Sequence, residues 1–522
     1  MKQHKKAQLT PLSPSLAANI DRIHKRFGGS SDLVIRPFRG DAAPDRQLAI
    51  VYLDGLVDAE SVQESVLEPI MAMRLPERMN AKGARLAEAL RNCIIAVGSV
   101  KDVGTLEEAI QHVTDGLCLI LADSSGVALT ANVIGGEQRA ITTLQTQTAI
   151  RGPQQGFVEN IATNVSLVRR IIRSPNLHVR MRKIGRQSNT NVAVLYMDGI
   201  ADDGVVKEVF KRLAAIDIDV VLESGHIEEL IQGETFTLFP TMLNSERPDV
   251  VAASLAEGRV AIIVDGTPIV LVAPATFFSF FQSAEDDYQR FDIAAFVRVI
   301  RYFAYAFSML LPSIYIAVTT YHQELLPTTL LISLAAQRRG VPFPGLVEGL
   351  LMELTFEVLR EAGLRMPRAI GPVISIVGAL VLGQAAVQAG IVSAGMVIVV
   401  SFAGISYFVL PDYNLAATSR LTRFAFMIMA GLLGLFGIFV LVLVLLVHMV
   451  SLRSFGVPYM SPIAPGSKGK RLWRDIFIRE SWWAVLMRPL DLKLRNPIRR
   501  RNHRKPPAQR WAGGSQGGEG MP

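Results

Sequence analysis

The chain has 522 residues, of which 50% are hydrophobic and 19% charged, and its formal net charge is +8 at pH 7. This length allows about three domains, and the apolar content is too high for a single soluble globule. The two cysteines, Cys93 and Cys118, lack metal-type spacing, which argues against a disulfide scaffold and a cysteine-based metal centre.

The first 44 residues are basic and then polar, without the apolar run of an export signal. We therefore expect residues 1–44 to form a mobile basic arm. We also expect the soluble region that follows to stay on the cytoplasmic side of a membrane.

An internal repeat organises that soluble region. The repeated segments are short strands rich in β-branched residues, each ending in turn residues, with helix-period sequence between them. The matching pairs are Leu48–Val62 with Val192–Val206, and Asp115–Thr130 with Glu257–Val272. The sequence therefore predicts a cytoplasmic α/β region of two related subdomains, at 45–150 and 151–289, the second with a connecting helix.

An all-α, polytopic membrane domain is predicted over 290–455. A spanning helix needs about 20 apolar residues. Three runs without charged residues have 22, 42 and 29 residues, and the middle run is long enough for two helices. The predicted spans are 302–323, 369–389, 391–410 and 424–452.

Arginines flank the predicted spans on both sides. Arg298 and Arg301 precede the first span, and Arg453 with a basic tail follows the last. Because positive charge next to spans stays in the cytoplasm, we expect both termini there and an even number of crossings.

Small residues and helix breakers indicate how the spans pack. Pro312 lies inside the first span and Gly390 separates the second from the third, so both are candidates for a kink or a gate. Glycines along the spans favour close helix packing, within one chain or between copies. They are Gly378, Gly383, Gly431, Gly434 and Gly437.

The segment 325–367, between the first and second predicted spans, is predicted to be amphipathic or re-entrant. Its charged part, Gly345–Arg365, would be ~31 Å long as a helix, enough to cross a bilayer. Each charged residue at mid-bilayer would cost roughly 2.5 to 3.5 kcal/mol. An ordinary lipid-facing span is therefore excluded for this helix.

Most charges of this helix share one arc, opposite leucine and valine side chains. The arc either lies at the membrane interface, where Glu357/Arg360 and Glu361/Arg365 neutralise each other, or lines a water-filled cation path. The pattern leaves both interpretations open. The ion-path candidates are Glu348, Glu353, Glu357, Glu361, Gln384 and Gln388.

The tail at 456–522 is basic and rich in tryptophan. From Ser451 onward the chain holds 15 Lys/Arg and 4 Asp/Glu. A basic segment after a membrane helix is typical of contact with anionic lipid on the cytoplasmic side, and we favour this over nucleic-acid binding. The sequence contains no P-loop, nucleophile elbow, H-E-x-x-H or Cys/His cluster, so we expect no enzyme activity, cofactor or metal.

Eight segments, read in order, form a recognisable set. Three lie in the soluble region: RGPQQGFVENIATNVSLVRR, VVLESGHIEELI and EGRVAIIVDGTPIVLVAP. Five lie in the membrane region: YIAVTTYHQELLPTTLL, AAQRRGVPFP, MELTFEVLREAGLRMP, IGPVISIVGALVLGQAAVQAGIVS and LRSFGVPYMSPIAP. Together they resemble the A subunit of the spore-germination nutrient receptors, the GerA family, over about residues 45–466.

The resemblance implies a subunit of a germinant receptor in the inner membrane of an endospore. Members work with a permease-like membrane B subunit and a lipoprotein C subunit. The resemblance further implies a homo-oligomeric, ligand-gated channel that releases monovalent cations to begin germination. A non-conducting scaffold that relays the signal of the B and C subunits is the alternative.

Overall fold

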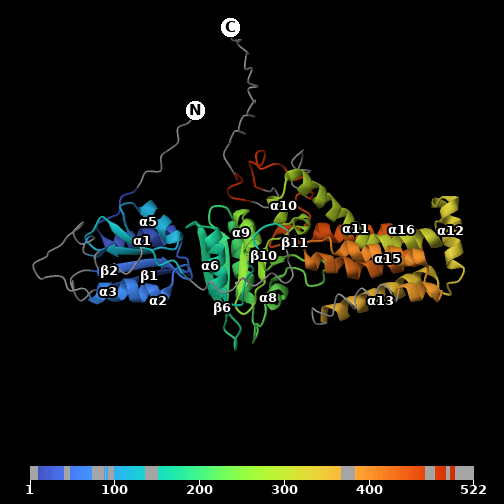
Figure 1. The fold of residues 1–522 in the computed structure, drawn as a ribbon, viewed down its shortest axis with the longest axis horizontal. Helices are drawn as coiled ribbons and strands as arrows, with labels where there is room; N and C mark the ends of the chain where they lie inside the picture. The colour runs from blue at the N-terminus through green and yellow to red at the C-terminus, as the bar shows by residue number, and fades with distance from the viewer. Residues whose placement is uncertain are drawn as a thin grey trace, which may run out of the picture.

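The computed structural model describes most of the chain. The described residues are 10–39, 47–72, 88, 90–91, 99–135, 151–365, 383–464, 476–488 and 494–499. They form two α/β units and a helical region, which follow one another along the longest axis of the molecule (Figure 1).

The first unit is a five-stranded antiparallel sheet with helices on both faces. Its elements are α1 (Leu16–Arg26), β1 (Leu33–Arg39), β2 (Gln47–Leu53), α2 (Ala59–Val62), η1 (Gln63–Leu67), α3 (Glu68–Ala72), β3 (Val100–Val103), α5 (Leu106–Thr114), β4 (Cys118–Ala122) and β5 (Ala128–Ala131). The strand order is β1-β2-β4-β5-β3. Ile50 packs with α2, η1 and α3 on one face, whereas its neighbour Val51 packs with α1 and α5 on the other.

The expected mobile arm at 1–44 is wrong for residues 10–39, which form α1 and β1. Ser15 caps α1 by accepting a hydrogen bond from the Ala18 amide. Ile23 and Phe27 are fully buried against the sheet. Their helical spacing was hidden by the many polar residues between them, so the composition of this segment misled the prediction.

The second unit repeats the same sheet. Its elements are α6 (Ile161–Ile171), β6 (Leu177–Ile184), β7 (Thr190–Met197), α7 (Asp203–Ala215), α8 (Ser224–Ile231), β8 (Leu243–Ser245), α9 (Pro248–Ala256), β9 (Val260–Val264) and β10 (Val270–Ala273). The order β6-β7-β9-β10-β8 corresponds strand for strand to that of the first unit. The internal repeat of the sequence is therefore also a repeat of structure.

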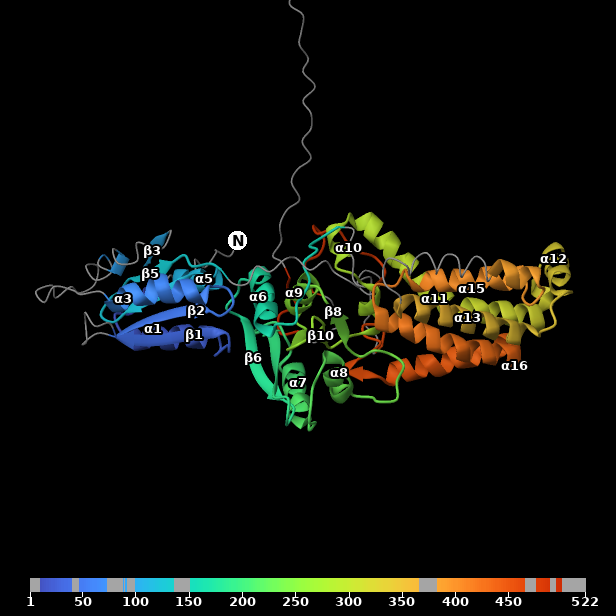
Figure 2. The same cartoon turned by 60° about the horizontal axis from the view of Figure 1, so that its bottom comes forward.

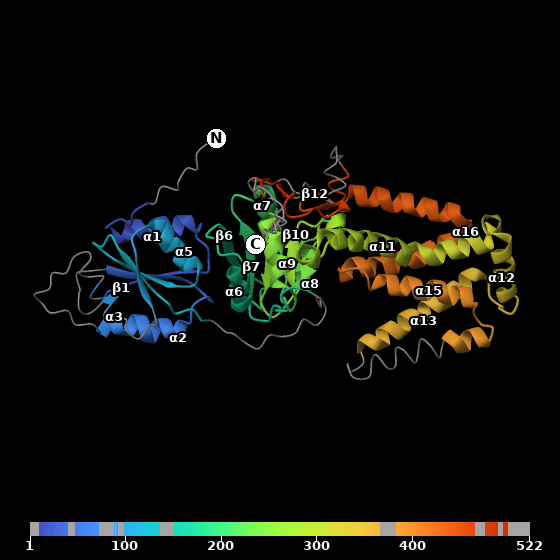
Figure 3. The same ribbon diagram turned by 45° about the horizontal axis from the view of Figure 1, so that its top comes forward.

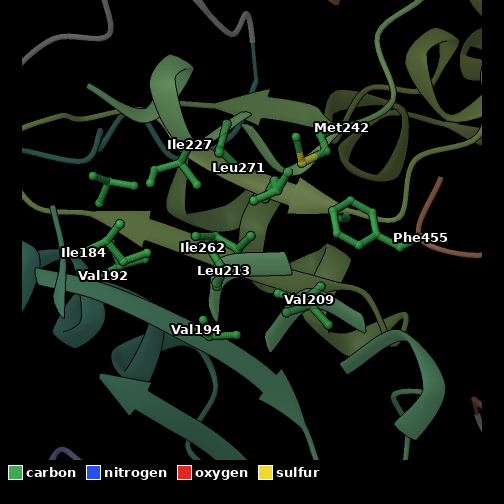
Figure 4. Packing of buried hydrophobic residues seen from close by; sticks show 14 of the residues in the cluster. Ile184, Val192, Val194, Val209, Leu213, Ile227, Met242, Ile262, Leu271 and Phe455 are labelled. Atoms are coloured by element: carbon green, nitrogen blue, oxygen red, sulfur yellow. The ribbon is translucent and has the colours of Figure 1, made fainter. Parts of the chain in front are cut away.

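The core of the second unit includes a residue from beyond the helical region. Phe455 lies between the short strands β11 (Arg453–Ser454) and β12 (Val457–Pro458) and packs with Val209, Leu213 and Met242 (Figure 4). The chain that leaves the last long helix thus returns to the second unit. The first residues of the predicted tail belong to this packed structure.

The two units are joined by a buried ion pair. Arg169 on α6 donates from Nε to Asp32 Oδ2 at 2.7 Å and from Nη2 to Asp32 Oδ1 at 3.0 Å. The same Nη2 also donates to Ser30 Oγ at 3.0 Å. Both partners of the pair are almost fully buried, so this contact fixes the first unit against the second.

The helical region consists of long helices that run side by side away from the second unit (Figures 1 and 2). Its elements, with the two short helices before it, are η2 (Phe277–Phe281), α10 (Glu285–Tyr288), α11 (Phe291–Thr320), η3 (Gln323–Leu325), α12 (Thr328–Arg338), α13 (Gly345–Arg365), α15 (Ala394–Tyr407) and α16 (Tyr413–Ser451). We call the end beside the second unit the near end. The opposite end, where α12 lies, is the distal end (Figure 3).

The long helix α16 folds back on itself. A straight helix of 39 residues would span about 58 Å. However, Thr418 Oγ1 donates to the Leu238 carbonyl, and His448 Nε2 lies 2.9 Å from the Thr237 hydroxyl, so both ends of α16 meet one loop of the second unit. The reversal is at Gly434, where φ is +63° and the backbone is not helical.

Two of the described helices, α11 and α16, are long and apolar enough to cross a membrane, and α15 is a shorter apolar helix. They contain most of the predicted spans 302–323, 424–452 and 391–410. The prediction of one unbroken helix over 424–452 is wrong, because the turn at Gly434 divides it into two arms. The predicted span 369–389 falls for the most part outside the described residues.

Candidate functional site: the charged face of α13

The charged segment forms the helix α13, which packs inside the helical region. It runs antiparallel to the first arm of α16, since Leu346 contacts Gly431 at one end and Glu357 pairs with Arg420 at the other. Arg360 of α13 lies over the ring of Tyr407, the last residue of α15. The helix therefore extends from the distal end toward the near end alongside α15.

The exposed face of α13 is apolar and its inner face is charged. Leu354 and Val358 are 60% and 61% exposed, whereas Glu348 and Glu353 have no exposed surface. A soluble protein would place these residues the other way round. The arrangement is typical of a helix whose outer face meets lipid and whose charges face other helices.

Glu353 is held by an arginine of α16. Arg423 Nη1 donates to Glu353 Oε1, and neither side chain has any exposed surface. Burying either charge alone would be costly, so Glu353 and Arg423 can both be buried only because they form a pair. The cost of a charge at mid-bilayer applies to a glutamate without such a partner.

Glu357 is shared by two arginines. Arg360, one turn further along α13, donates to its Oε1 at 3.1 Å, and Arg420 of α16 binds it through Nε and Nη2. The guanidinium of Arg360 also stacks on Tyr407 at 4.4 Å from the ring centroid. The predicted Glu357/Arg360 pair is confirmed, with Arg420 as an additional partner.

Glu348 lies on another side of the helix and caps α15. Its Oε1 accepts hydrogen bonds from the amide of Ser393, at 2.6 Å, and from the Ser393 hydroxyl. Ser393 is the N-cap of α15, where the helix dipole favours a negative charge. Glu348 therefore joins the distal end of α13 to the start of α15.

The remaining ion-path candidates lie outside this buried network. Glu361 pairs with Arg365 as predicted, but both side chains are exposed. Gln384 and Gln388 are exposed in the short helical segment before α15. The structure therefore divides the six candidates into three that make contacts inside the chain, of which Glu348 and Glu353 are buried and Glu357 is partly buried, and three on its surface.

The predicted kink and packing residues have distinct places. Pro312 is buried inside α11, and Gly390 has φ +67° and lies against the Gly340 carbonyl. Gly431 packs against Leu346, and Gly437 packs within the turn of α16 near Met429. Gly383 is half-buried, Gly434 forms the turn itself, and Gly378 lies outside the described residues.

Sequence reasoning missed Arg420 and Arg423. Both residues lie just before the predicted span 424–452. Arg420 and Arg423 are three residues apart, and Glu353 and Glu357 are four apart, so each pair lies on one face of its helix about one turn apart. On two antiparallel helices that face each other, such pairs can contact one another. This complementary pair of spacings was the available signal.

The family follows from comparison with known sequences. A family model described as Bacillus/Clostridium GerA spore germination protein matches residues 21–490. The chain belongs to the GerA family. Among its relatives, spore germination protein KA of Bacillus subtilis is 47% identical over 97% of this chain and 91% of that protein. Spore germination protein GerLA of Bacillus cereus is 38% identical over 95% of this chain and 100% of that protein.

A solved structure is also similar to this GerA-family chain. It is the N-terminal domain of the A subunit of the Bacillus megaterium spore germinant receptor GerK3. The match has 38% sequence identity and a TM-score of 0.42, and it covers 52% of this chain and 98% of that domain.

Proposed function

We propose that this GerA-family chain is the A subunit of a nutrient germinant receptor and triggers endospore germination as an oligomeric, ligand-gated channel for monovalent cations. The observation that carries the proposal is the inverted helix α13, with charge inside and leucine and valine outside. Charged residues at membrane depth are costly, and membrane proteins retain them where they serve an ion path or pair with one another to fix the helices around it. The family assignment supports the germination role.

The topology that fits this role is a multi-pass protein of the spore inner membrane with both terminal regions in the cytoplasm. In this topology α11, α13, α15 and the two arms of α16 lie in the membrane together with the predicted span 369–389, which gives an even number of crossings, and the two α/β units lie on the cytoplasmic side. The near end of α11 supports this orientation, because Arg298 and Arg301 are held there by Asp286. A permease-like B subunit and a lipoprotein C subunit would complete the receptor.

Within an oligomer, the exposed polar residues are the better candidates to meet ions. Glu353 and Glu357 are neutralised within the chain and would hold α13 in position. Glu361, Gln384 and Gln388 are exposed and would be available at a path between protomers. The candidate gating positions remain Pro312 and Gly390.

Ion flux tests the proposal directly. The chain, co-reconstituted with its B and C subunits in liposomes, should pass K⁺ when the germinant is added. Glu361→Gln should change cation selectivity or flux, because it removes an exposed charge from the proposed path. Glu229→Gln, an exposed position on α8, is the matched control and should leave flux unchanged. An assembled receptor that passes no K⁺ under any germinant would exclude the channel.

The alternative is a non-conducting scaffold that holds the B and C subunits and relays their signal. The fully buried Glu353–Arg423 pair favours it, because structural anchoring alone explains such a contact. The oligomeric state separates the two functions. A ring of this chain around a central axis supports the channel, whereas a single copy bound to one B subunit supports the scaffold.

A further inference from the structure

A cavity lies where the second α/β unit meets the near end of the helical region. Its volume is about 410 Å³, within the range that accommodates a small ligand. Its walls come from α9, from the η2–α10 connection, from Arg301 on α11 and from the loop between α15 and α16. A molecule in this cavity would touch both the soluble unit and the helices.

Buried arginines line the cavity. Arg247 and Arg259 are each 4% exposed, and Arg301 is 6% exposed. Asp249 fixes the Arg247 guanidinium through two hydrogen bonds, and Asp286 and the Phe281 carbonyl fix that of Arg301. A guanidinium has five N–H donors, and the bonds to Asp249 and Asp286 use only some of them. The remaining N–H groups of these fixed side chains can donate to the oxygens of a carboxylate or phosphate without much further ordering.

Acidic residues line the same cavity. Asp412 is buried and caps α16 by accepting a hydrogen bond from the Leu415 amide at 2.9 Å. Burial raises the pKa of the Asp412 carboxyl to about 7. Glu285 lines the wall as well. An ammonium group beside these carboxyls would supply the opposite charge that favours their ionised form.

We propose that this junction cavity binds a small group that carries both an oxyanion and an ammonium. The arginines receive the oxyanion, and the ammonium lies toward Asp412 and Glu285. Two sources offer this chemistry: a free zwitterion, and the phosphoethanolamine headgroup of a membrane lipid. The site goes beyond the channel function and does not depend on conduction.

The position of Asp412 gives the site a consequence for the helices. Asp412 begins α16, and the preceding residues Phe408 and Val409 also line the cavity. An occupied cavity therefore ties the start of α16 to α9 of the second unit. Removal of the ligand should loosen the α15–α16 loop more than any other part of the helical region.

Binding is measured with the full chain in detergent by isothermal titration calorimetry. The probes are glycine and phosphoethanolamine as zwitterions, inorganic phosphate as an anion and ethylamine as a cation. The lipid source is tested in nanodiscs, where phosphatidylethanolamine and phosphatidylglycerol are compared for protection of the α15–α16 loop from hydrogen exchange. At least one zwitterionic probe should bind at least tenfold more tightly than phosphate or ethylamine.

Variants locate the binding. Asp412→Asn should weaken zwitterion binding at least tenfold while it keeps the helix cap. Ala253→Phe, on α9, fills the cavity and should also abolish binding, whereas Ala256→Phe is on an exposed position of the same helix outside the cavity and should bind like the wild type. Size-exclusion profiles show that each variant is folded.

The outcomes separate clearly. If a free zwitterion binds and phosphatidylethanolamine protects the loop no better than phosphatidylglycerol, the ligand is a soluble molecule. If phosphatidylethanolamine protects the loop better and no free zwitterion binds, the ligand is a lipid headgroup. Phosphate that binds as tightly as phosphoethanolamine, wild-type affinity in folded Ala253→Phe, or the absence of both kinds of binding overturns the proposal. None of these results depends on K⁺ flux, so failure here leaves the channel proposal standing.

Discussion

Glu353 of α13 and Arg423 of α16 form an ion pair in which neither side chain has exposed surface. The two residues are 70 positions apart in sequence, and their pair lies beside the Glu357–Arg420 pair. Together these contacts set the register between α13 and the first arm of α16. The inward-facing glutamates Glu353 and Glu357 of α13 are therefore explained by the arginines of α16 that pair with them.

Loss of one member of the buried pair should destabilise the helical region strongly. Glu353→Gln leaves the Arg423 charge buried without its carboxylate, which costs about 3 to 5 kcal/mol for a fully buried pair. Thermal unfolding in detergent measures the loss. Glu361→Gln, whose partner Arg365 is exposed, should change stability by less than about 1 kcal/mol.

The double variant Glu353→Met/Arg423→Met tests the reason for this loss. It removes both charges and keeps similar side-chain volume, so most of the stability lost in Glu353→Gln should return. If the single variant is as stable as the wild type, the pair does not anchor α13. Equal losses in the single and double variants would instead mean that the specific contacts, not charge burial, matter.

The turn at Gly434 should tolerate no side chain. Its φ of +63° and ψ of −143° lie in a region that is essentially restricted to glycine, so Gly434→Ala should cost about 1 to 3 kcal/mol. The Tyr321 hydroxyl donates to the Gly431 carbonyl at 2.8 Å and so joins the end of α11 to the residues just before the turn. Tyr321→Phe should therefore destabilise the same turn by about 1 kcal/mol.

Gly340→Ala is the matched control for the turn, because no atom lies within 4 Å of the position of its added methyl group. A spin-label distance between the near ends of the two arms of α16 reports whether the hairpin persists. A short distance in the wild type that lengthens in Gly434→Ala is expected. If Gly434→Ala leaves both the stability and the distance unchanged, the turn does not require glycine at this position.

The repeat in the soluble half was readable from sequence because strand segments carry their own pattern. The alternation of Ile50 and Val51 between two faces, and the same pattern near Val192, follow directly from the side-chain period of two. The arm prediction failed where this local signal was weak. Ile23 and Phe27 are separated by charged and polar residues, and only contact with the sheet reveals why they are buried.

The charged helix shows what a single segment cannot predict. The arc of Glu353 and Glu357 was visible from periodicity, but its direction depends on Arg420 and Arg423, which are distant in sequence. The turn at Gly434 was equally hidden, because glycine in an apolar run suggests packing as readily as reversal. Non-local partners decided both features.

The pair between the two α/β units should depend on arginine geometry. Arg169→Lys keeps the charge but loses the two-point contact with Asp32 and the bond to Ser30, so it should destabilise the soluble half by about 2 kcal/mol or more. Arg186→Lys provides the contrast, because its pair with Asp217 is exposed and should be worth less than about 1 kcal/mol. Hydrogen exchange at β1 and β6 measures both. Equal effects of the two substitutions would contradict a special role for the buried pair.

The carboxyl of Asp412 should make stability depend on pH. Burial raises its pKa from 3.8 to about 7 in the folded chain. Between about pH 4 and pH 7 the unfolded chain has released this proton while the folded chain still holds it, so stability should fall as the pH rises through that window. Above about pH 7 both states are ionised, and the contribution should become constant.

Asp412→Asn isolates this contribution. Asparagine is an equally good N-cap but does not titrate, so the variant should lose less stability than the wild type between about pH 4 and pH 7. Asp202→Asn, at the N-cap of α7, is the matched control and should follow the wild-type curve. Midpoints of thermal unfolding across the window provide the measurement. If the curves of Asp412→Asn and the wild type are parallel throughout, the carboxyl is ionised in the folded chain, and an ammonium ligand would then be unnecessary to stabilise its charge.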